Sequence, residues 1–372
     1  MRVLLAGGGT AGHINPALAI AGYIKSKRPD TEFLFIGNQG GMEQRLVTQA
    51  GYNIKSIKIS GFKRSFSPKS IAENIKTVGR TFSSSAASKK IISDFKPDIC
   101  IGTGGYVSGP VVRTAAKMGI PCIIHEQNAY PGVTNKMLAK RVKTVMLAVE
   151  AAKKYFPDSN VVVTGNPVRS EILTANKEES RKKLGLDERP VVLSFGGSLG
   201  ARKINEAVAD LVARSGKDQR YQHIHAYGGY GEWFPQLVKE KGTDISSCKN
   251  LDIRPYIDNM PECMAAADLV ICRAGAITLS EIQAMGKPAI LIPSPNVAEN
   301  HQYHNAMALV NAGAAEIIEE SELSGEALTK KVDQMLKSPD KLNKIGENSR
   351  KMAITNANER IYSVIKKVLG LV

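Results

Sequence analysis

Two glycine-rich segments in the first half of the chain have the composition of strand-to-helix turns. Each directly follows a short apolar run, and they read Gly7-Gly8-Gly9-Thr10-Ala11-Gly12-His13 and Gly102-Thr103-Gly104-Gly105-Tyr106-Val107-Ser108-Gly109-Pro110. Glycine lets the backbone take positive φ and present N–H groups at a helix N-terminus, where partial positive charge suits phosphate. Such turns also occur where a helix merely packs against a strand. Two of them in one half favour ligand binding, and a phosphate-bearing ligand is the first expectation.

Titratable and amide side chains stand at the ends of these apolar runs. His13 closes the first turn, where a neutral imidazole beside a helix N-terminus could act as a general base; a histidine without chemistry is the alternative. His125, Glu126 and Asn128 follow the apolar run that begins at Pro121. They could position an acceptor or form a buried hydrogen-bond network between domains. His13 and Glu126 are thus the two catalytic candidates.

The second half repeats the pattern with different side chains. The segment Ser194-Phe195-Gly196-Gly197-Ser198-Leu199-Gly200-Ala201 predicts a turn whose amides and Ser198 hydroxyl could bind a diphosphate, or a tight turn capped by Ser198. Glu281 lies early in a predicted helix, where it could accept hydrogen bonds from ribose hydroxyls or simply complement the helix dipole. The polar loop 293–305 suits sugar hydroxyls, with a solvated helix cap as the alternative.

Alternating apolar and amphipathic runs must position these residues. The predicted strands of the first half are Arg2–Ala6, Glu32–Ile36, Asn53–Ile59, Asp98–Gly102, Pro121–His125, Thr144–Ala148 and Val161–Thr164. Those of the second half are Val191–Phe195, Gln222–Ala226, Leu251–Ile253, Leu269–Arg273 and Ala289–Pro293. Helical stretches between them predict parallel sheets covered on both faces, so the fold class is α/β, with two doubly wound Rossmann-like domains.

The domain boundary is expected at Gly165–Pro167, where glycine and proline end a strand and a polar, lysine-rich connection follows. We expect domains over residues 1–165 and 166–354. Three helices are predicted at the end of the chain, Gly325–Lys337, Lys341–Ala353 and Asn358–Leu369. The last of them, within about 355–372, could cross back and brace the first domain. In doubly wound domains, ligands bind at the carboxyl ends of the strands.

Charge and composition limit the possible functions. Residues 1–165 carry a net charge of +14 and residues 166–372 only +1, so the first half faces something acidic. Aromatic residues make up only 6% and no nucleic-acid-binding motif is present, which favours a membrane surface or a phosphorylated substrate over nucleic acid. Basic and apolar residues alternate between Phe62 and Lys90, as expected for a surface on anionic lipid or for an ordinary basic helix face.

Other sequence signals point to a soluble protein without metal. No apolar run has the length of a membrane span, and no signal peptide precedes the first glycine turn, so we expect the chain to stay in the cytoplasm. The five cysteines lack the spacing of metal ligands. We expect them to be reduced and mostly buried, and we expect no metal site.

The motifs together resemble the MurG family of glycosyltransferases. They are GGGTAGH at 7–13, GTGGYVSGP at 102–110, HEQN at 125–128, GNPVR at 165–169, GGSLGA at 196–201 and RAGAITLSE at 273–281. The resemblance implies a two-domain GT-B enzyme without a cofactor. It implies transfer of GlcNAc from UDP-GlcNAc to the C4 hydroxyl of MurNAc in lipid I, with inversion, giving lipid II. The enzyme would lie peripherally at the cytoplasmic face of the bacterial membrane, with cell-wall elongation or division proteins as further partners.

The resemblance also implies roles for individual residues. Thr10, Ala11 and Gly12 would line the acceptor side, and Asn128 and Arg169 would contact the donor. Other residues would hold the diphosphate, uracil, ribose and GlcNAc: Ser198, Ile257, Ala276, Ile277, Thr278, Leu279, Ser280, Glu281 and Gln302. Three alternatives remain at this point: a non-catalytic UDP-sugar-binding subunit, a lipid glycosyltransferase acting on diacylglycerol, and a UDP-GlcNAc 2-epimerase of the same fold.

Overall fold

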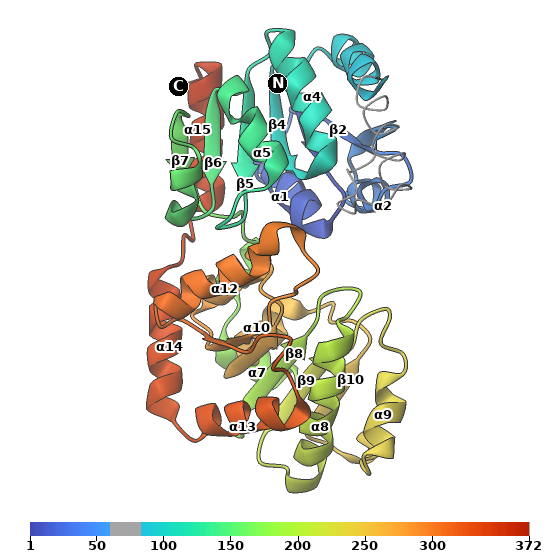
Figure 1. The fold of residues 1–372 in the computed structure, drawn as a ribbon, viewed down its shortest axis with the longest axis vertical. Helices are drawn as coiled ribbons and strands as arrows, with labels where there is room; N and C mark the ends of the chain where they lie inside the picture. Colours follow the sequence, from blue (N-terminus) through green and yellow to red (C-terminus); the bar gives the residue numbers. More distant parts are fainter. Residues whose placement is uncertain (60–82, 372) are drawn as a thin grey trace. The chain divides into compact units, whose positions relative to one another are not determined.

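The apolar runs of the chain form two separate parallel sheets, each with its own set of helices (Figure 1). The computed structural model describes residues 1–59 and 83–371. Contacts group these residues into two units. Unit 1 comprises the described residues of Met1–Pro167 and Asn356–Val372, and unit 2 is Val168–Thr355. The expected fold class, α/β with two doubly wound parallel sheets, is confirmed.

Unit 1 contains a seven-stranded parallel sheet in the order β3-β2-β1-β4-β5-β6-β7. Its strands are β1 (Arg2–Gly7), β2 (Glu32–Asn38), β3 (Asn53–Ile57), β4 (Ile99–Gly104), β5 (Cys122–Glu126), β6 (Thr144–Leu147) and β7 (Val161–Val163). The order reverses between β1 and β4. Crossovers leave these neighbouring strands in opposite directions, so the loops after them flank the place where such sheets bind ligands.

Helices cover both faces of this sheet. They are α1 (Ala11–Lys27), α2 (Met42–Gln49), a helical stretch at 83–95, α4 (Gly105–Lys117), α5 (Val133–Leu138), η1 (Ala139–Arg141), η2 (Glu150–Tyr155) and α15 (Ala357–Leu369). Most of the basic segment between Phe62 and Lys90 lies outside the described residues. Of its basic residues, Lys89 and Lys90 are described, and both are exposed.

Unit 2 repeats the arrangement with six strands in the order β10-β9-β8-β11-β12-β13. The strands are β8 (Val191–Phe195), β9 (Gln222–Ala226), β10 (Leu251–Arg254), β11 (Leu269–Cys272), β12 (Ala289–Leu291) and β13 (Glu316–Ile317). The order reverses between β8 and β11. The turns after these two strands therefore lie at the corresponding switch point of unit 2.

The helices of unit 2 include two that the sequence analysis missed. They are α6 (Ser170–Thr174), α7 (Lys177–Lys183), α8 (Arg202–Asp218), α9 (Phe234–Glu240), η3 (Ile245–Ser247), α10 (Met260–Ala266), α11 (Ala276–Met285), η4 (Ala298–Asn300), α12 (His301–Asn311), α13 (Gly325–Leu336) and α14 (Pro339–Lys351). The segment expected to be a polar connection contains α6 and α7. Asn176 caps α7 by accepting hydrogen bonds from two backbone N–H groups, which stabilises a short polar helix.

Two observations concern the thiols and the membrane. All five cysteines are free thiols, and four of them are buried, as expected. Among the described residues, no helix combines the length and the apolar character needed to cross a membrane.

The last helix of the chain belongs to the core of unit 1. α15 packs on α1 and β6, and Figure 1 shows it in red next to β6. Ile361, Val364 and Ile365 join the apolar cluster that also contains Ile14 and Ile20 of α1. The helix is strongly amphipathic, which lets one face be buried while Lys366 and Lys367 stay near its C-terminus.

Unit 2 contains two buried neutral histidines. His223 and His225 are two residues apart on β9, so they face the same side of the sheet, and each ring lies 2.8 Å from the Ser194 hydroxyl of β8. Burial lowers the pKa of His223 to about 3 and holds the pKa of His225 well below its usual value. Both are therefore neutral at physiological pH.

The packing of α15 predicts that Ile365→Ala destabilises unit 1. The fully buried side chain would leave a cavity, at a cost of about 2–5 kcal/mol in the free energy of unfolding. Urea unfolding followed by circular dichroism measures this loss. Ser363→Ala on the exposed face of the same helix is the control and should change the free energy of unfolding by less than about 0.5 kcal/mol. Equal effects of the two substitutions would contradict the packing described here.

The buried histidines predict that unit 2 loses stability in mild acid. The unfolded chain binds protons near pH 6.5, whereas folded His223 resists protonation down to about pH 3, so stability falls as pH drops between these values. The single tryptophan, Trp233, lies in unit 2, so its fluorescence reports the unfolding of this unit. The double variant His223→Gln, His225→Gln should show a flatter dependence of the urea midpoint between pH 7.5 and 5. If the urea midpoint of the double variant fell with pH as steeply as that of the wild type, these two histidines would not be the cause of the acid sensitivity.

Candidate functional site

The two glycine turns of unit 1 pack directly against each other. β1 and β4 are neighbours, and their pairing register shifts between Ala6 and Gly7. A Cβ on Gly105 would overlap the backbone oxygen of Gly8, and a Cβ on Gly7 would overlap the hydroxyl of Thr103. Gly105 also has a φ of +75°, in the region that favours glycine. Close contact between the two turns is therefore one reason for glycine at these positions.

A buried carboxylate that the sequence analysis missed contacts the first glycine turn. Glu43 of α2 accepts hydrogen bonds from the backbone N–H of Asn38 at 2.7 Å and of Gly9 at 3.4 Å. A Cβ on Gly8 would lie 2.5 Å from the same carboxylate. The Gly9 amide thus faces a protein carboxylate, which argues against the first expectation that this amide binds a phosphate. An acid in the first turn of a helix directly after Gly40-Gly41 was the available signal.

Thr10, Ala11 and Gly12 form the entry into α1. Thr10 is its N-cap and accepts backbone hydrogen bonds from His13 and Ile14, while its own side chain makes no capping hydrogen bond. Thr10 and Gly12 are exposed and Ala11 is partly exposed. These three residues are accessible to a ligand, as the expected acceptor side requires.

His13 lies one residue further, with its ring held on one side. Its Nδ1 is 3.2 Å from the carbonyl oxygen of Thr103 and 3.2 Å from Oε1 of Gln127. The Thr103 hydroxyl in turn donates to the carbonyl of His13 at 2.7 Å. The structure thus joins the first turn, the second turn and the HEQN segment at this imidazole. Gln127 was not among the predicted site residues.

The HEQN segment forms a buried hydrogen-bond network whose described members lie within unit 1, whereas the sequence-based alternative was a network between domains. His125 is fully buried, and desolvation lowers its pKa. The Glu126 carboxylate accepts from the backbone N–H groups of Asn128 and Gly132, and from the amides of Asn128 and Asn135, at 2.8–3.0 Å. A buried carboxylate with four donors has its acceptor sites filled. We therefore interpret Glu126 as the residue that holds the loop 127–135, in place of the catalytic role considered above.

In unit 2, the turn after β8 is rich in glycine and leads into a long helix. Gly197 and Gly200 have φ values of +98° and +83°, and Ser198 is exposed between them. A Cβ on Gly200 would overlap the carbonyl of Tyr227 on the loop after β9. The turn leads into α8, whose first turn contains no acidic residue. Its N-terminus therefore keeps the positive end of a 17-residue helix dipole uncompensated.

Glu281 lies in α11, which follows β11 at the same switch point. It is the sixth residue of the helix, beyond the first turn where the dipole acts most strongly, so dipole complementation explains it poorly. The carboxylate is buried and pairs with Arg169, whose Nε and Nη2 both lie 3.0 Å from Oε1. Burial raises the pKa of Glu281, and the guanidinium opposes that shift. A partly exposed arginine thus covers a buried carboxylate.

The remaining predicted donor residues differ in accessibility. Ala276, Ile277, Thr278 and Ser280 of α11 are partly exposed, whereas Leu279 is buried in the core. The side chain of Ile257 also belongs to the core, so only its backbone could contact a ligand. The Gln302 Oε1 accepts from the backbone N–H of Ser294 at 2.9 Å, which closes the polar loop before α12.

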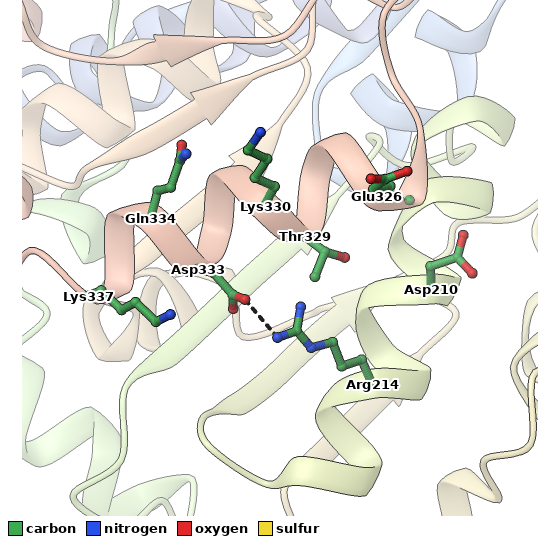
Figure 2. A pocket seen from close by; sticks show the side chains of 9 residues that line it. Asp210, Arg214, Glu326, Thr329, Lys330, Asp333, Gln334 and Lys337 are labelled. Atoms are coloured by element: carbon green, nitrogen blue, oxygen red, sulfur yellow. Dashed lines mark ion pairs between the residues drawn. The ribbon is translucent and has the colours of Figure 1, made fainter.

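A hollow of about 590 Å³ lies between α8 and α13 and is lined by none of the predicted site residues (Figure 2). Three of its charged side chains form ion pairs: Arg214 contacts Asp333 at 2.8 Å, and Asp210 contacts Lys241 at 2.6 Å. We interpret it as a groove left by the packing of two helices.

Comparison with known proteins agrees with this arrangement. Residues 3–147 match the glycosyltransferase family 28 N-terminal domain and residues 191–362 the glycosyltransferase family 28 C-terminal domain. A protein of Acetivibrio thermocellus named UDP-N-acetylglucosamine--N-acetylmuramyl-(pentapeptide) pyrophosphoryl-undecaprenol N-acetylglucosamine transferase is 50% identical over 371 residues. The match covers 99% of this chain and 98% of that protein.

Solved structures separate the family from proteins that share only its fold. Acinetobacter baumannii MurG superposes with a TM-score of 0.77 at 27% identity and covers 98% of this chain and 99% of its own. A UDP-GlcNAc 2-epimerase from Neisseria meningitidis has a TM-score of 0.65 at 15% identity, over 99% of this chain and all of that one, which shows the fold alone. Full-length sequence similarity, rather than fold, therefore decides between the transferase and the epimerase: the chain belongs to the MurG family of glycosyltransferases.

Proposed function

We propose that this chain transfers GlcNAc from UDP-GlcNAc to the C4 hydroxyl of the MurNAc residue of lipid I and so forms lipid II. The observation that carries the proposal is the imidazole of His13. Its Nδ1 is held by two acceptors beside an accessible glycine turn, in a chain of the MurG family. The acceptor sugar would lie against Thr10, Ala11 and Gly12.

His13 is the proposed general base. Its Nε2 takes the proton of the C4 hydroxyl while the hydroxyl oxygen bonds to C1 of GlcNAc. The bond from C1 to the diphosphate oxygen breaks on the opposite face, so the configuration inverts and UDP leaves with the electron pair. The imidazolium then returns its proton to solvent. A positioned base of this kind accelerates a reaction by about 10²- to 10⁴-fold.

The turn after β8 is proposed to stabilise the departing UDP. Its exposed Ser198 hydroxyl and the N-terminus of α8 would face the diphosphate, where negative charge increases as the glycosidic bond breaks. Donors that are fixed before the reaction need little reorganisation during it, which is why such sites lower the barrier.

Other residues are proposed to select the donor. Glu281 would accept hydrogen bonds from the ribose hydroxyls, and Arg169, released from Glu281 or still beside it, would contact the donor. The remaining donor contacts would come from Asn128, the backbone of Ile257, residues 276–280 of α11 and Gln302.

The proposed site of action is the cytoplasmic face of the bacterial membrane, with the enzyme bound peripherally. The concentration of positive charge in residues 1–165 supports attraction to anionic lipids, each basic residue near such a surface adding about 1 kcal/mol. Proteins of cell-wall elongation or division are proposed as further partners. Transfer of labelled GlcNAc to a lipid I analogue, with UDP-glucose as a competing donor, tests the whole proposal. Donor binding without transfer would contradict it.

His13→Ala is expected to lower kcat by about 10²- to 10⁴-fold, because it removes the base. The Kd for UDP-GlcNAc should stay within about twofold, since the proposed donor contacts lie elsewhere. Single-turnover transfer and isothermal titration measure the two quantities. His13→Asn, which keeps a donor toward Thr103 without a basic nitrogen, distinguishes loss of the base from loss of folding and should be equally slow. An unchanged kcat in either variant would exclude His13 as the base.

Glu281→Gln is expected to raise the Kd for UDP-GlcNAc about 10- to 100-fold, because hydrogen bonds to a charged acceptor contribute about 1.5–3 kcal/mol. Glu316→Gln is the matched control. Glu316 is also a carboxylate of unit 2 and pairs with Lys331 and Lys341, but it lies outside the predicted site. Its substitution should leave donor affinity unchanged. Equal affinities of all three proteins would remove Glu281 from the donor site.

A further inference from the structure

We infer that Gln127 is a positioning residue that fixes the protonated nitrogen of His13, and that His125 and the carbonyl of Gly165 fix Gln127 in turn. The inference rests on the proposed role of His13 as base. A chain of hydrogen bonds inside unit 1 carries it: Gly165 to His125, His125 to Gln127, and Gln127 to His13.

The first link fixes the protonation of His125. Its Nε2 lies 2.9 Å from the carbonyl oxygen of Gly165, which can only accept, so Nε2 carries a hydrogen. The same carbonyl accepts from the Thr164 hydroxyl at 3.1 Å. Because complete burial lowers its pKa, His125 is neutral at physiological pH. A neutral imidazole has one N–H, so its Nδ1 is an acceptor.

The second link fixes the orientation of the Gln127 amide. One end of the amide lies 3.0 Å from the carbonyl of Thr103, 3.0 Å from the carbonyl of His125 and 3.1 Å from the His125 Nδ1. All three are acceptors, so this end must be the NH₂ group. The oxygen of the amide therefore faces the other way. Gln127 is 2% exposed, so water offers little competition for either end.

The third link fixes the tautomer of His13. Its Nδ1 lies between two acceptors, the Gln127 Oε1 and the Thr103 carbonyl, each at 3.2 Å. Nδ1 must therefore carry the hydrogen in the neutral ring, which leaves the lone pair on Nε2. Among the described residues, Nε2 of His13 has no hydrogen-bond partner. The neutral ring thus presents the nitrogen that a general base needs.

The wild-type protein tests the inference without any substrate. The chain has six histidines, so ¹⁵N-histidine labelling and a long-range ¹H–¹⁵N spectrum resolve each imidazole, with His13→Asn assigning the ring of interest. We expect neutral His13 protonated on Nδ1 and His125 protonated on Nε2. A His13 ring protonated on Nε2 would overturn the inference, whatever the activity of the enzyme.

Gln127→Met tests the consequence for catalysis. The variant removes one of two acceptors from Nδ1, so we expect a mixture of His13 tautomers and a kcat about 10- to 100-fold lower. The loss is smaller than the roughly 10⁴-fold known for a complete loss of tautomer control in a catalytic triad, because the Thr103 carbonyl remains.

A matched control separates positioning from stability. Gln222→Met removes another buried glutamine, which bonds the backbone of Asp187 in unit 2. It should leave the His13 tautomer and kcat unchanged. An unmoved tautomer in Gln127→Met would overturn the inference, whereas a fully active His13→Ala would instead overturn the proposed base.

Discussion

Unit 1 depends on one packing constraint, the direct contact of two backbone turns at the switch point between β1 and β4. Gly7 and Gly105 leave no space for a Cβ, because Thr103 and Gly8 occupy it. This contact brings the Thr103 carbonyl to His13, and the end of β5 adds Gln127. A side chain at either glycine would separate the turns and break the hydrogen bonds of His13 with Thr103 and Gln127. The close packing of the two turns thus permits the hydrogen bonds that join His13, Thr103 and Gln127.

Desolvation has the same effect on the pKa of three buried histidines, but their rings differ in how many hydrogen-bond partners they have. Desolvation lowers the pKa values of His125, His223 and His225 alike. In His125 both ring nitrogens have protein partners, so burial yields one defined tautomer. In His223 and His225 one nitrogen of each ring lacks a partner among the described residues, which costs stability. Burial alone keeps a ring neutral; a full set of partners also fixes its hydrogen.

The sequence predicted the two sheets and their glycine turns, because strands and turns follow from local pattern, whereas the roles of the site residues stay predictions. Glu281 and Arg169 were both named, although their ion pair was not predicted. Gln127 and Glu43 were missed. The amide of Gln127 gains its role only from three acceptors supplied by β4 and β5, and Glu43 from glycines distant in sequence. The two-residue β13 was also missed, since so short an edge strand carries no periodic signal.

The position of α15 has a consequence for how the chain folds during its synthesis. Helix 357–369 completes the apolar cluster that also contains Val3, Leu5 and residues of α1, so the part of the sheet that α15 covers stays exposed while the ribosome makes the residues between them. Unit 2 is continuous in sequence and can fold as it emerges. The core of unit 1 is complete only after α15 has been made. The unit whose strands are made first is therefore the second whose core can close, and nascent chains expose the part of the first sheet that α15 covers until this helix emerges.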